Sequence, residues 1–428
     1  MANPKEGVFL SDLDLNFFQA VAENMESKRN VKLLGFHPTE SELFGITSTV
    51  SSQGNDEALI GLKSYTITYT ICGLDDEAAA KTTSKDIVIK LRKNTSALQQ
   101  DYADFFGTFS ADLGRETKRV SGNVYWKDLT LRDLYCLSET LEVEEWRALL
   151  PSIYSLTNNQ QQHKYAYVMD NFLSPHNGYS HLNMIETPNV WTRDDVLQVF
   201  SVFAKFHALY YANAQQIPAK LRNVIDFPLT AAKFRELKPL IKLHHDLILK
   251  EKGPYFESVL SIYENAWNSS DEIFGVLEKA PSSLTHNDCT IRNMCKRSQL
   301  RPGQSEICVF DWEIARLAPP QHDIVEFLLF WLPADVTASA WYDYLENYRK
   351  LLVKAVHEKG NTLSADDLQY LEMEKFIEVS DMCLLEIVLL RHQLYMTSTL
   401  AIDLPFLKRS LDVRNTLLRD MQPRYSFL

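Results

Sequence analysis

One stretch, residues 284–330, constrains this 428-residue chain most, because polar side chains stand in it at spacings that suit a loop and a strand end. In order, these residues are His286, Asp288, Asn293, Asp311 and Asp323. Asp288 and Asn293 are five residues apart, which is too far for one face of a strand and typical of a loop. The apolar run ICVF ends on Asp311, so we expect this carboxylate at the end of a buried strand.

These side chains match the needs of phosphoryl transfer from a metal-bound nucleotide. Asp288 can accept the proton of an attacking hydroxyl or chiefly orient it, because a loose transition state needs little base strength. Asn293 and Asp311 offer a neutral and a charged oxygen, which are ligands that Mg²⁺ prefers. His286 is better interpreted as a scaffold residue whose ring bonds the loop backbone. A single Asp would indicate little, but the ordered set favours a kinase site over an ordinary polar loop.

Length, charge and cysteine usage indicate a soluble protein of two domains or one bilobed unit. The formal net charge of −12 at pH 7 argues against a broad surface for nucleic acid or anionic membrane. We find no secretory signal and no run of roughly 18 apolar residues, so we expect no membrane segment. The six cysteines are scattered without CxxC pairs, which fits free thiols in a reducing, cytoplasmic compartment.

The N-terminal part reads as a helix over residues 11–29 followed by a small antiparallel sheet. The expected strands are residues 44–51, 64–72 and 86–91. The third strand carries Lys90, and the loop before the second holds Gly54 and Gly61. Kinases hold nucleotide phosphates with a glycine-bearing loop and a strand lysine, so Lys90 and Gly61 are candidate nucleotide-binding residues. A lysine on an edge strand that reaches water is the alternative.

Residues 98–150 have a helical pattern, in which a kinase needs an acid to pair with the strand lysine. We predict Glu116 as the partner of Lys90. Asp112 and Glu139 are competing candidates, and a solvated helix acid is as good an interpretation of any one of them.

Two short strands are expected at residues 153–156 and 165–169. The second ends at Met169 and Asp170, where backbone groups of a kinase hinge would bind the adenine edge. An ordinary strand end is the alternative, and only the order of the elements favours a hinge.

The C-terminal part is predicted to be mostly helical. Thr192 and Asp195 form the start of a capping box, and His207 lies on the apolar stripe of the same helix, where a core histidine is expected. The further helical segments are residues 230–280, 341–358, 366–399 and 405–421. The predicted class is therefore α+β and bilobed, with a small antiparallel-sheet N-lobe over residues 1–172 and a larger helical C-lobe over residues 173–428.

The opening stretch resembles the catalytic and metal-binding segment of the aminoglycoside phosphotransferase and choline kinase superfamily, which includes an ecdysteroid-kinase-like branch. The family's H-G-D-x4-N motif corresponds to residues 286–293. Its Asp-Trp-Glu type of segment corresponds to residues 310–313, and its later D-P…D motif corresponds to residues 319–325. The resemblance extends over about residues 40–335 and is specific within residues 284–325. It implies the bilobed fold of protein kinases.

The resemblance also implies a role for individual residues. Asp288 matches the catalytic acid–base position, Asn293 and Asp311 match the metal ligands, Lys90 matches the phosphate-binding lysine, and Asp323 matches a structural acid that braces the catalytic loop. The implied cofactors are ATP and Mg²⁺. Two features depart from the family: Asn287 replaces the usual glycine, and Gly61 stands in a hydrophobic segment, ALIGLK.

We therefore predict an ATP-dependent kinase that phosphorylates a hydroxyl of a small metabolite, natural product or antibiotic. The acids Glu326 and Asp343, which have tryptophans near them in sequence, would suit an amine-bearing, cationic acceptor. One alternative is a non-catalytic nucleotide- or ligand-binding module, which the intact site residues argue against. The other is a protein kinase, which the missing G-x-G-x-x-G, H-R-D and A-P-E motifs argue against. The oligomeric state is not indicated.

Overall fold

The structure is a computed structural model in which the chain forms two compact units. It describes residues 13–27, 30–39, 61–72, 81–92, 95–120, 129–138, 143–159, 161, 164–172, 174, 177–181, 191–226, 229–298, 300, 303–399 and 405–428. Unit 1 comprises residues 1–105, 128–181 and 295–313, and unit 2 comprises residues 106–127, 182–294 and 314–428. The chain thus passes from one unit to the other several times, which differs from the single boundary predicted after residue 172.

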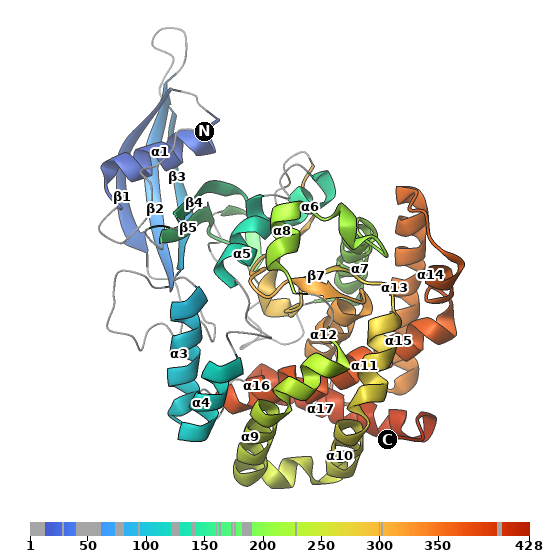
Figure 1. Ribbon diagram of the computed structural model, residues 1–428. Coiled ribbons are helices and arrows are strands. Elements are labelled where there is room, and N and C mark those ends of the chain that lie inside the picture. The colour runs from blue at the N-terminus through green and yellow to red at the C-terminus, as the bar shows by residue number, and fades with distance from the viewer. Residues whose placement is uncertain are drawn as a thin grey trace. The chain divides into compact units, whose positions relative to one another are not determined.

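Unit 1 contains a five-stranded antiparallel sheet with the order β1-β2-β3-β5-β4 (Figure 1). Its strands are β1 (Asn30–Thr39), β2 (Gly61–Cys72), β3 (Lys81–Arg92), β4 (Ile153–Asn159) and β5 (Lys164–Asp170). The other elements are α1 (Leu15–Met25), α3 (Thr95–Gly107), α5 (Leu129–Ser138), α6 (Glu144–Leu149), β6 (Tyr179–His181), β8 (Met294–Arg297) and β9 (Ile307–Val309). Helix α3 and strand β8 each have residues on both sides of a unit boundary. Because β3 pairs with β2 on one side and with β5 on the other, it is an interior strand and its residues do not lie at an edge of the sheet.

Helix α1 lies against this sheet (Figure 1), and its apolar residues belong to the core cluster of the sheet. Asp14 caps the helix by accepting a hydrogen bond of 2.9 Å from the backbone N–H of Phe17. The ring of Phe18 stacks on Phe36 of β1 with a centroid separation of 4.0 Å. The helix predicted at residues 11–29 is therefore present, although it is shorter.

The strand predictions are only partly correct. Strand β1 was not predicted, and the strand predicted at residues 44–51 lies outside the described residues, as does Gly54. The placement of Gly61 in a loop is wrong, because Gly61 is the first residue of β2 and pairs with Leu91 of β3. Strand pairing with β3 extends the ordered segment beyond the residues whose own β-propensity is high.

Unit 2 is mostly helical. Its elements are α4 (Ala111–Val120), α7 (Arg193–Ala208), η5 (Ala214–Gln216), α8 (Ala219–Val224), α9 (Ala231–Phe256), η6 (Glu257–Val259), α10 (Leu260–Asn268), α11 (Ser270–Lys279), β7 (Ser283–Thr285), η7 (Ile291–Asn293), β10 (Arg316–Ala318), α12 (Gln321–Trp331), α13 (Ala338–Lys359), α14 (Ala365–Gln369), α15 (Met373–Leu389), α16 (Arg391–Thr399), α17 (Pro405–Met421) and η8 (Gln422–Arg424). The fold class is confirmed: the protein is α+β, with a small antiparallel sheet in one unit and a larger helical unit.

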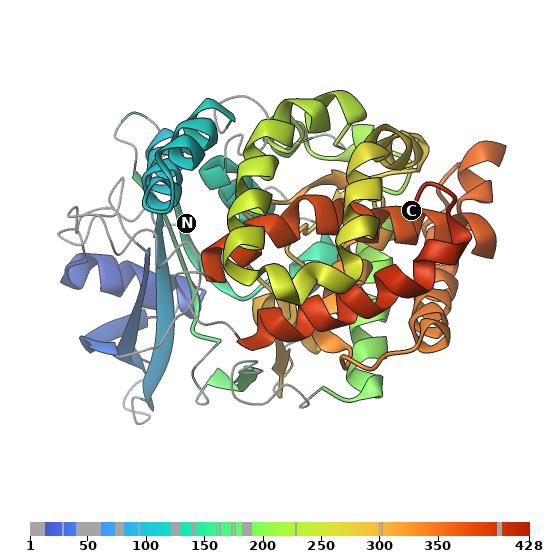
Figure 2. The same ribbon diagram turned by 90° about the horizontal axis from the view of Figure 1, so that it is seen from below.

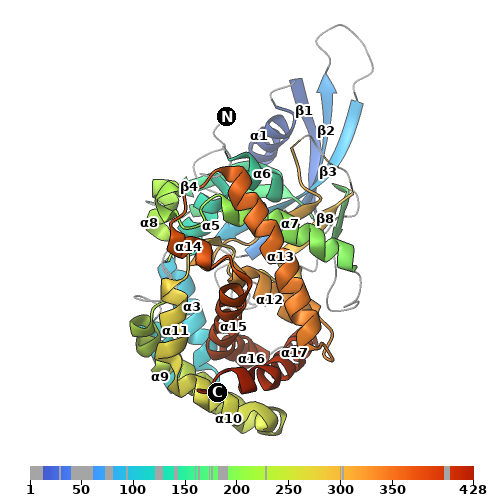
Figure 3. The same cartoon turned by 90° about the vertical axis from the view of Figure 1, so that its right-hand side faces the viewer.

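The centre of unit 2 is formed by α12 and α15, which are buried over nearly their whole circumference. α12 packs on α15 and α17, and α13 packs along α7 (Figure 3). The yellow-green helices include α9, which contacts α16, and α10, which contacts α15; both partners are red to orange (Figure 2). Two acids in this core are paired with buried arginines, Glu326 with Arg391 and Glu386 with Arg316. Within the described residues, no helix has the length and apolar character that a membrane crossing requires.

The start of α7 is as predicted, because Thr192 and Asp195 form a capping box. The helix predicted over residues 366–399 is instead three helices, α14, α15 and α16. The last break falls at Leu390, whose φ of −114° and ψ of −72° lie in the right-handed region but depart from ideal helical values. Arg391 is the first residue of α16.

The packing of α1 leads to a stability prediction. Phe18→Ala removes a fully buried ring, so we expect the free energy of unfolding to fall by about 3–5 kcal/mol. Leu15→Ala in the same helix is the matched control, because Leu15 is 62% exposed and its loss should change stability by less than about 0.5 kcal/mol. Urea denaturation of both variants measures the difference, and equal effects would contradict the assigned packing.

Candidate active site

Lys90 stands among three carboxylates in unit 1. Its Nζ lies 2.5 Å from Asp311 Oδ1, 2.9 Å from Asp133 Oδ2 and 4.0 Å from Glu313 Oε2. Lys90 is only 7% exposed and pairs with Tyr167 on the neighbouring strand β5. The interpretation of Lys90 as an edge lysine that reaches water is therefore excluded.

Asp133 on α5 is the helix acid that pairs with Lys90, so the prediction of Glu116 was wrong. Glu116 lies on α4, which belongs to unit 2, and its carboxylate pairs with Arg119 at 2.7 Å. Asp133 is fully buried and accepts a hydrogen bond of 2.9 Å from the hydroxyl of Tyr167. The sequence does contain a signal for Asp133, because it stands inside the mostly apolar segment LRDLYCL, where an acid is expected to be buried and paired.

Asp311 follows β9, as predicted, and its backbone is in the left-handed region with φ +69°. This conformation is unfavourable for a non-glycine residue, so its neighbours must hold it. Phe310 stacks on Phe172 with a centroid separation of 3.8 Å, and the Trp312 indole donates to the carbonyl of Val309 at 3.3 Å. With both neighbours anchored, the Asp311 carboxylate is left about one third exposed.

The residues around Asp311 fit a hard divalent cation. One oxygen each from Asp133, Asp311 and Glu313 can lie within 4.8 Å of one another. Oxygen-only ligand sets of this kind suit Mg²⁺. Glu313 was recognised only as part of the family motif, and the structure places it in the same carboxylate group.

In unit 2, Asp288 and Asn293 stand in the loop after β7, as their spacing predicted. The Asn293 amide donates to Asp288 Oδ2 at 2.8 Å and to the Asp288 carbonyl at 2.9 Å. Arg292 approaches the same Oδ2 at 3.3 Å, and Arg391 donates to Oδ1 at 2.9 Å. Three side chains therefore hold this acid, and the sequence predicted the loop but none of these contacts.

Asp323 braces this loop from the buried start of α12. Its Oδ2 accepts the backbone N–H of His286 at 2.7 Å, and its Oδ1 accepts that of Asn287 at 2.8 Å. The Nε2 atom of His207 lies 3.1 Å from Oδ2, and the His207 Nδ1 atom lies 2.6 Å from the hydroxyl of Tyr348. The predictions of a structural acid and of a core histidine are confirmed.

The loop backbone explains the replacement of glycine by asparagine. Asn287 has φ +62°, a left-handed conformation that glycine and, less readily, asparagine adopt. Its side-chain amide donates to the carbonyl of Ile314 at 2.9 Å. His286 acts as the predicted scaffold residue, because its Nδ1 accepts the backbone N–H of Asp288 at 3.2 Å. Asn287 thus keeps the backbone conformation and adds an anchor.

Asp170 at the end of β5 has a fully engaged side chain. Its carboxylate accepts hydrogen bonds from the hydroxyls of Tyr154 and Tyr179 and pairs with Lys85 at 2.9 Å. Burial would raise the pKa of Asp170, but Lys85 and the two hydroxyls hold it below its usual value. The backbone N–H of Asp170 donates to the carbonyl of Ser152 at 3.1 Å, and the hinge role of Met169 and Asp170 stays a prediction.

The sequence model of the ecdysteroid kinase-like family matches residues 137–360, which is more than half of the chain. This protein belongs to the ecdysteroid kinase-like family. The matched stretch contains Asp288, Asn293 and Asp311, whereas Lys90, Asp133 and Arg391 lie outside it.

Solved structures of small-molecule kinases are distantly similar to this kinase-like protein. A choline/ethanolamine kinase family protein from Mesorhizobium loti is 11% identical with a TM-score of 0.40, over 85% of this chain and 87% of that one. Choline kinase LicA from Streptococcus pneumoniae is 12% identical with a TM-score of 0.36, over 82% and 94%. Aminoglycoside 2'-phosphotransferase-IIIa is 13% identical with a TM-score of 0.40, over 87% and 97%. No curated protein matches the chain.

Glu326 of this kinase-like protein does not face an acceptor, which corrects the prediction that it suits a cationic one. It is fully buried, its Oε1 lies 3.1 Å from Arg391, and its Oε2 accepts the backbone N–H of Cys289 at 2.9 Å. Burial raises its pKa to about 8, with Arg391 opposing the rise and Asp288 adding to it. Asp343 is exposed on α13.

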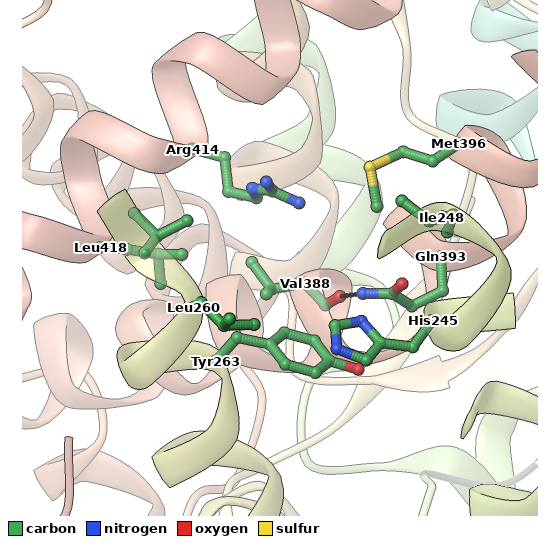
Figure 4. A pocket seen from close by; sticks show the side chains of 10 residues that line it. His245, Ile248, Leu260, Tyr263, Val388, Gln393, Met396, Arg414 and Leu418 are labelled. Carbon is green, nitrogen blue, oxygen red and sulfur yellow. Dashed lines mark hydrogen bonds between the residues drawn. The ribbon is translucent and has the colours of Figure 1, made fainter. Parts of the chain in front are cut away.

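Unit 2 also contains a pocket of about 310 Å³, including its open mouth (Figure 4). Its lining consists of His245, Ile248, Val259, Leu260, Tyr263, Val388, Gln393, Met396, Arg414 and Leu418. The hydroxyl of Tyr263 and Oε1 of Gln393 are buried without a hydrogen-bond partner among the described residues. None of the described lining residues belongs to the loop at residues 286–293, so this pocket is a separate feature.

Substitution of Asn287 in this kinase-like protein tests the loop geometry. We expect Asn287→Gly to change the free energy of unfolding by less than about 1 kcal/mol, because glycine adopts positive φ without strain. Asn287→Val should cost about 1–3 kcal/mol, because a β-branched residue is strained at φ +62°. Denaturant unfolding of both variants provides the measurement, and equal stabilities would contradict the assigned backbone.

Glu326 should make stability depend on pH. Its pKa is about 8 in the folded protein and about 4.3 in the unfolded chain, so between these values the folded state alone keeps the proton. This contribution therefore lowers the free energy of unfolding as pH rises, by at most about 1.4 kcal/mol per pH unit. Glu326→Gln stays neutral, so its stability relative to the wild type should rise from pH 5 to pH 8. A difference that is independent of pH would refute the assignment.

Proposed function

We propose that this protein transfers the γ-phosphoryl group of ATP to a hydroxyl of a small molecule, with Mg²⁺ as cofactor. The observation that carries this proposal is the shared position of Lys90 between Asp133 and Asp311. A buried lysine fixed by a helix acid and placed beside a metal-binding acid is what nucleotide phosphates and a divalent ion require. Membership of a kinase-like family supports the same reaction class.

In unit 1, Lys90 would bind the phosphates, and Asp133 would keep the ammonium group in place. Asp311 would hold the divalent ion. Asn293 belongs to unit 2, and its role as an oxygen ligand stays a prediction. The ion would neutralise charge on the transferred group. The residues at the end of β5, Met169 and Asp170, would contribute backbone groups to the adenine, and the backbone at Gly61 would approach the phosphates.

In unit 2, Asp288 would accept a hydrogen bond from the acceptor hydroxyl and take its proton as the new O–P bond forms. The bond between the γ-phosphorus and the bridging oxygen would break in the same step, and ADP would leave. The Asn293 amide, which bonds both the carboxylate and the carbonyl of Asp288, would keep this acid in one orientation. Since Glu326 is buried, the geometry does not support a cationic acceptor over a neutral one. We propose a polyhydroxylated, ecdysteroid-like alcohol as the first acceptor to test and a cytoplasmic location for the reaction.

The experiment is a turnover assay with the purified chain, MgATP and a panel of one ecdysteroid, choline and one aminoglycoside, with product detection by mass spectrometry. Asp288→Ala should lower kcat by about 10²–10⁴-fold, and Asp311→Ala should abolish metal-dependent turnover. Asp246→Ala is the control, because this acid is exposed on α9 and forms an ion pair with Lys242 in the same helix.

Three outcomes would contradict the proposal. Full activity of either site variant would remove the assigned mechanism. A wild-type protein that binds nucleotide in calorimetry but phosphorylates no acceptor would favour the non-catalytic module, and phosphorylation of added protein substrates alone would favour a protein kinase.

A further inference from the structure

A buried arginine far along the chain contacts the candidate catalytic acid. Arg391 is the first residue of α16, is 5% exposed, and is 103 residues away from Asp288 in sequence. It lies beyond the stretch matched by the family model, which ends at residue 360. Neither the motif nor the family match assigns this residue a role.

The guanidinium of Arg391 joins three groups. Its Nη2 atom lies 2.9 Å from Asp288 Oδ1 and 3.1 Å from Glu326 Oε1. Its Nη1 atom donates to the carbonyl of Asn287. The planar fork of arginine can serve several oxygens at fixed angles, which the single ammonium of lysine cannot do. Arg391 therefore holds both the side chain of Asp288 and the backbone of the preceding residue.

The two oxygens of Asp288 differ in their surroundings. Oδ1 is held by Arg391, whose side chain is 6% exposed. Oδ2 accepts from Asn293 at 2.8 Å and has a longer contact of 3.3 Å with Arg292, whose side chain is 22% exposed. The longer, more exposed contact is the one that an incoming hydroxyl can replace at the lower cost. Oδ2 is therefore the oxygen that suits the acceptor.

We propose that Arg391 is a positioning residue for phosphoryl transfer: it clamps Oδ1 of Asp288 and the Asn287 carbonyl, so that Oδ2 faces the acceptor hydroxyl. This inference rests on the function proposed above. The alternative is a purely structural role, in which Arg391 only pairs with the buried Glu326. The two roles differ in what a truncated side chain does to kcat in a folded enzyme.

The test compares Arg391→Ala and Arg391→Lys with the wild type, using MgATP and the panel alcohol that the wild type phosphorylates best. We expect Arg391→Ala to lower kcat by about 100-fold, because a misplaced acid loses alignment with the hydroxyl, while KM for ATP changes less than about twofold. Millimolar guanidinium should restore part of kcat, and NaCl at the same ionic strength should not. The kcat of Arg391→Lys should lie between those of the wild type and Arg391→Ala, because lysine keeps the charge but lacks the planar fork of arginine.

Arg424→Ala is the matched control, because Arg424 also pairs with a buried acid of unit 2, Asp381, at the C-terminal end of the chain. We expect this substitution to lower the melting temperature and to leave kcat unchanged, with or without guanidinium.

The outcomes separate this inference from the proposed function. Wild-type turnover together with an Arg391→Ala variant of unchanged kcat would overturn the positioning role alone. The positioning role would also be overturned if guanidinium did not restore the kcat of Arg391→Ala and the Arg424→Ala control lost kcat together with stability in the same way. If Arg391→Ala does not fold, full activity of Arg391→Lys overturns the role, and reduced kcat at unchanged KM supports it. A wild type that phosphorylates no acceptor overturns both proposals.

Discussion

The buried carboxylate of Asp323 is the constraint on which the candidate catalytic loop depends. It accepts two consecutive backbone N–H groups of the loop and lies beside His207, all within the core of unit 2. A buried charge without such donors would cost several kcal/mol, so the acid and the loop require each other. This contact holds Asn287 in its left-handed conformation. The direction of Asp288 follows from it, and Arg391 then engages one oxygen of that acid.

Unit 1 shows a different kind of constraint, which is a concentration of carboxylates. Asp133, Asp311 and Glu313 lie around the ammonium group of Lys90. Carboxylates gathered in a partly buried group repel one another, so the arrangement favours cations beside them. Together with the left-handed backbone at Asp311, this is a set of residues arranged for function at some cost to stability.

The predictions that succeeded concern residues whose signal is local. The capping box at Thr192 and the loop position of Asp288 and Asn293 each follow from a few neighbouring residues. The choice of Glu116 failed because several helix acids have the same local pattern, and burial against the sheet selects Asp133. Gly61 was misplaced because strand pairing, which depends on residues far away in sequence, extends β2 to that position.

The sequence by itself determined the fold class, the order of the site residues and the family, because motif spacing and periodicity are properties of short segments. Only the tertiary structure decided which charges meet. Lys90 and Asp311 are 221 residues apart in sequence, and Arg391 and Asp288 are 103 apart. No local pattern encodes such partners, because long-range packing brings them together, and the buried charges are stable only where the fold supplies the opposite charge.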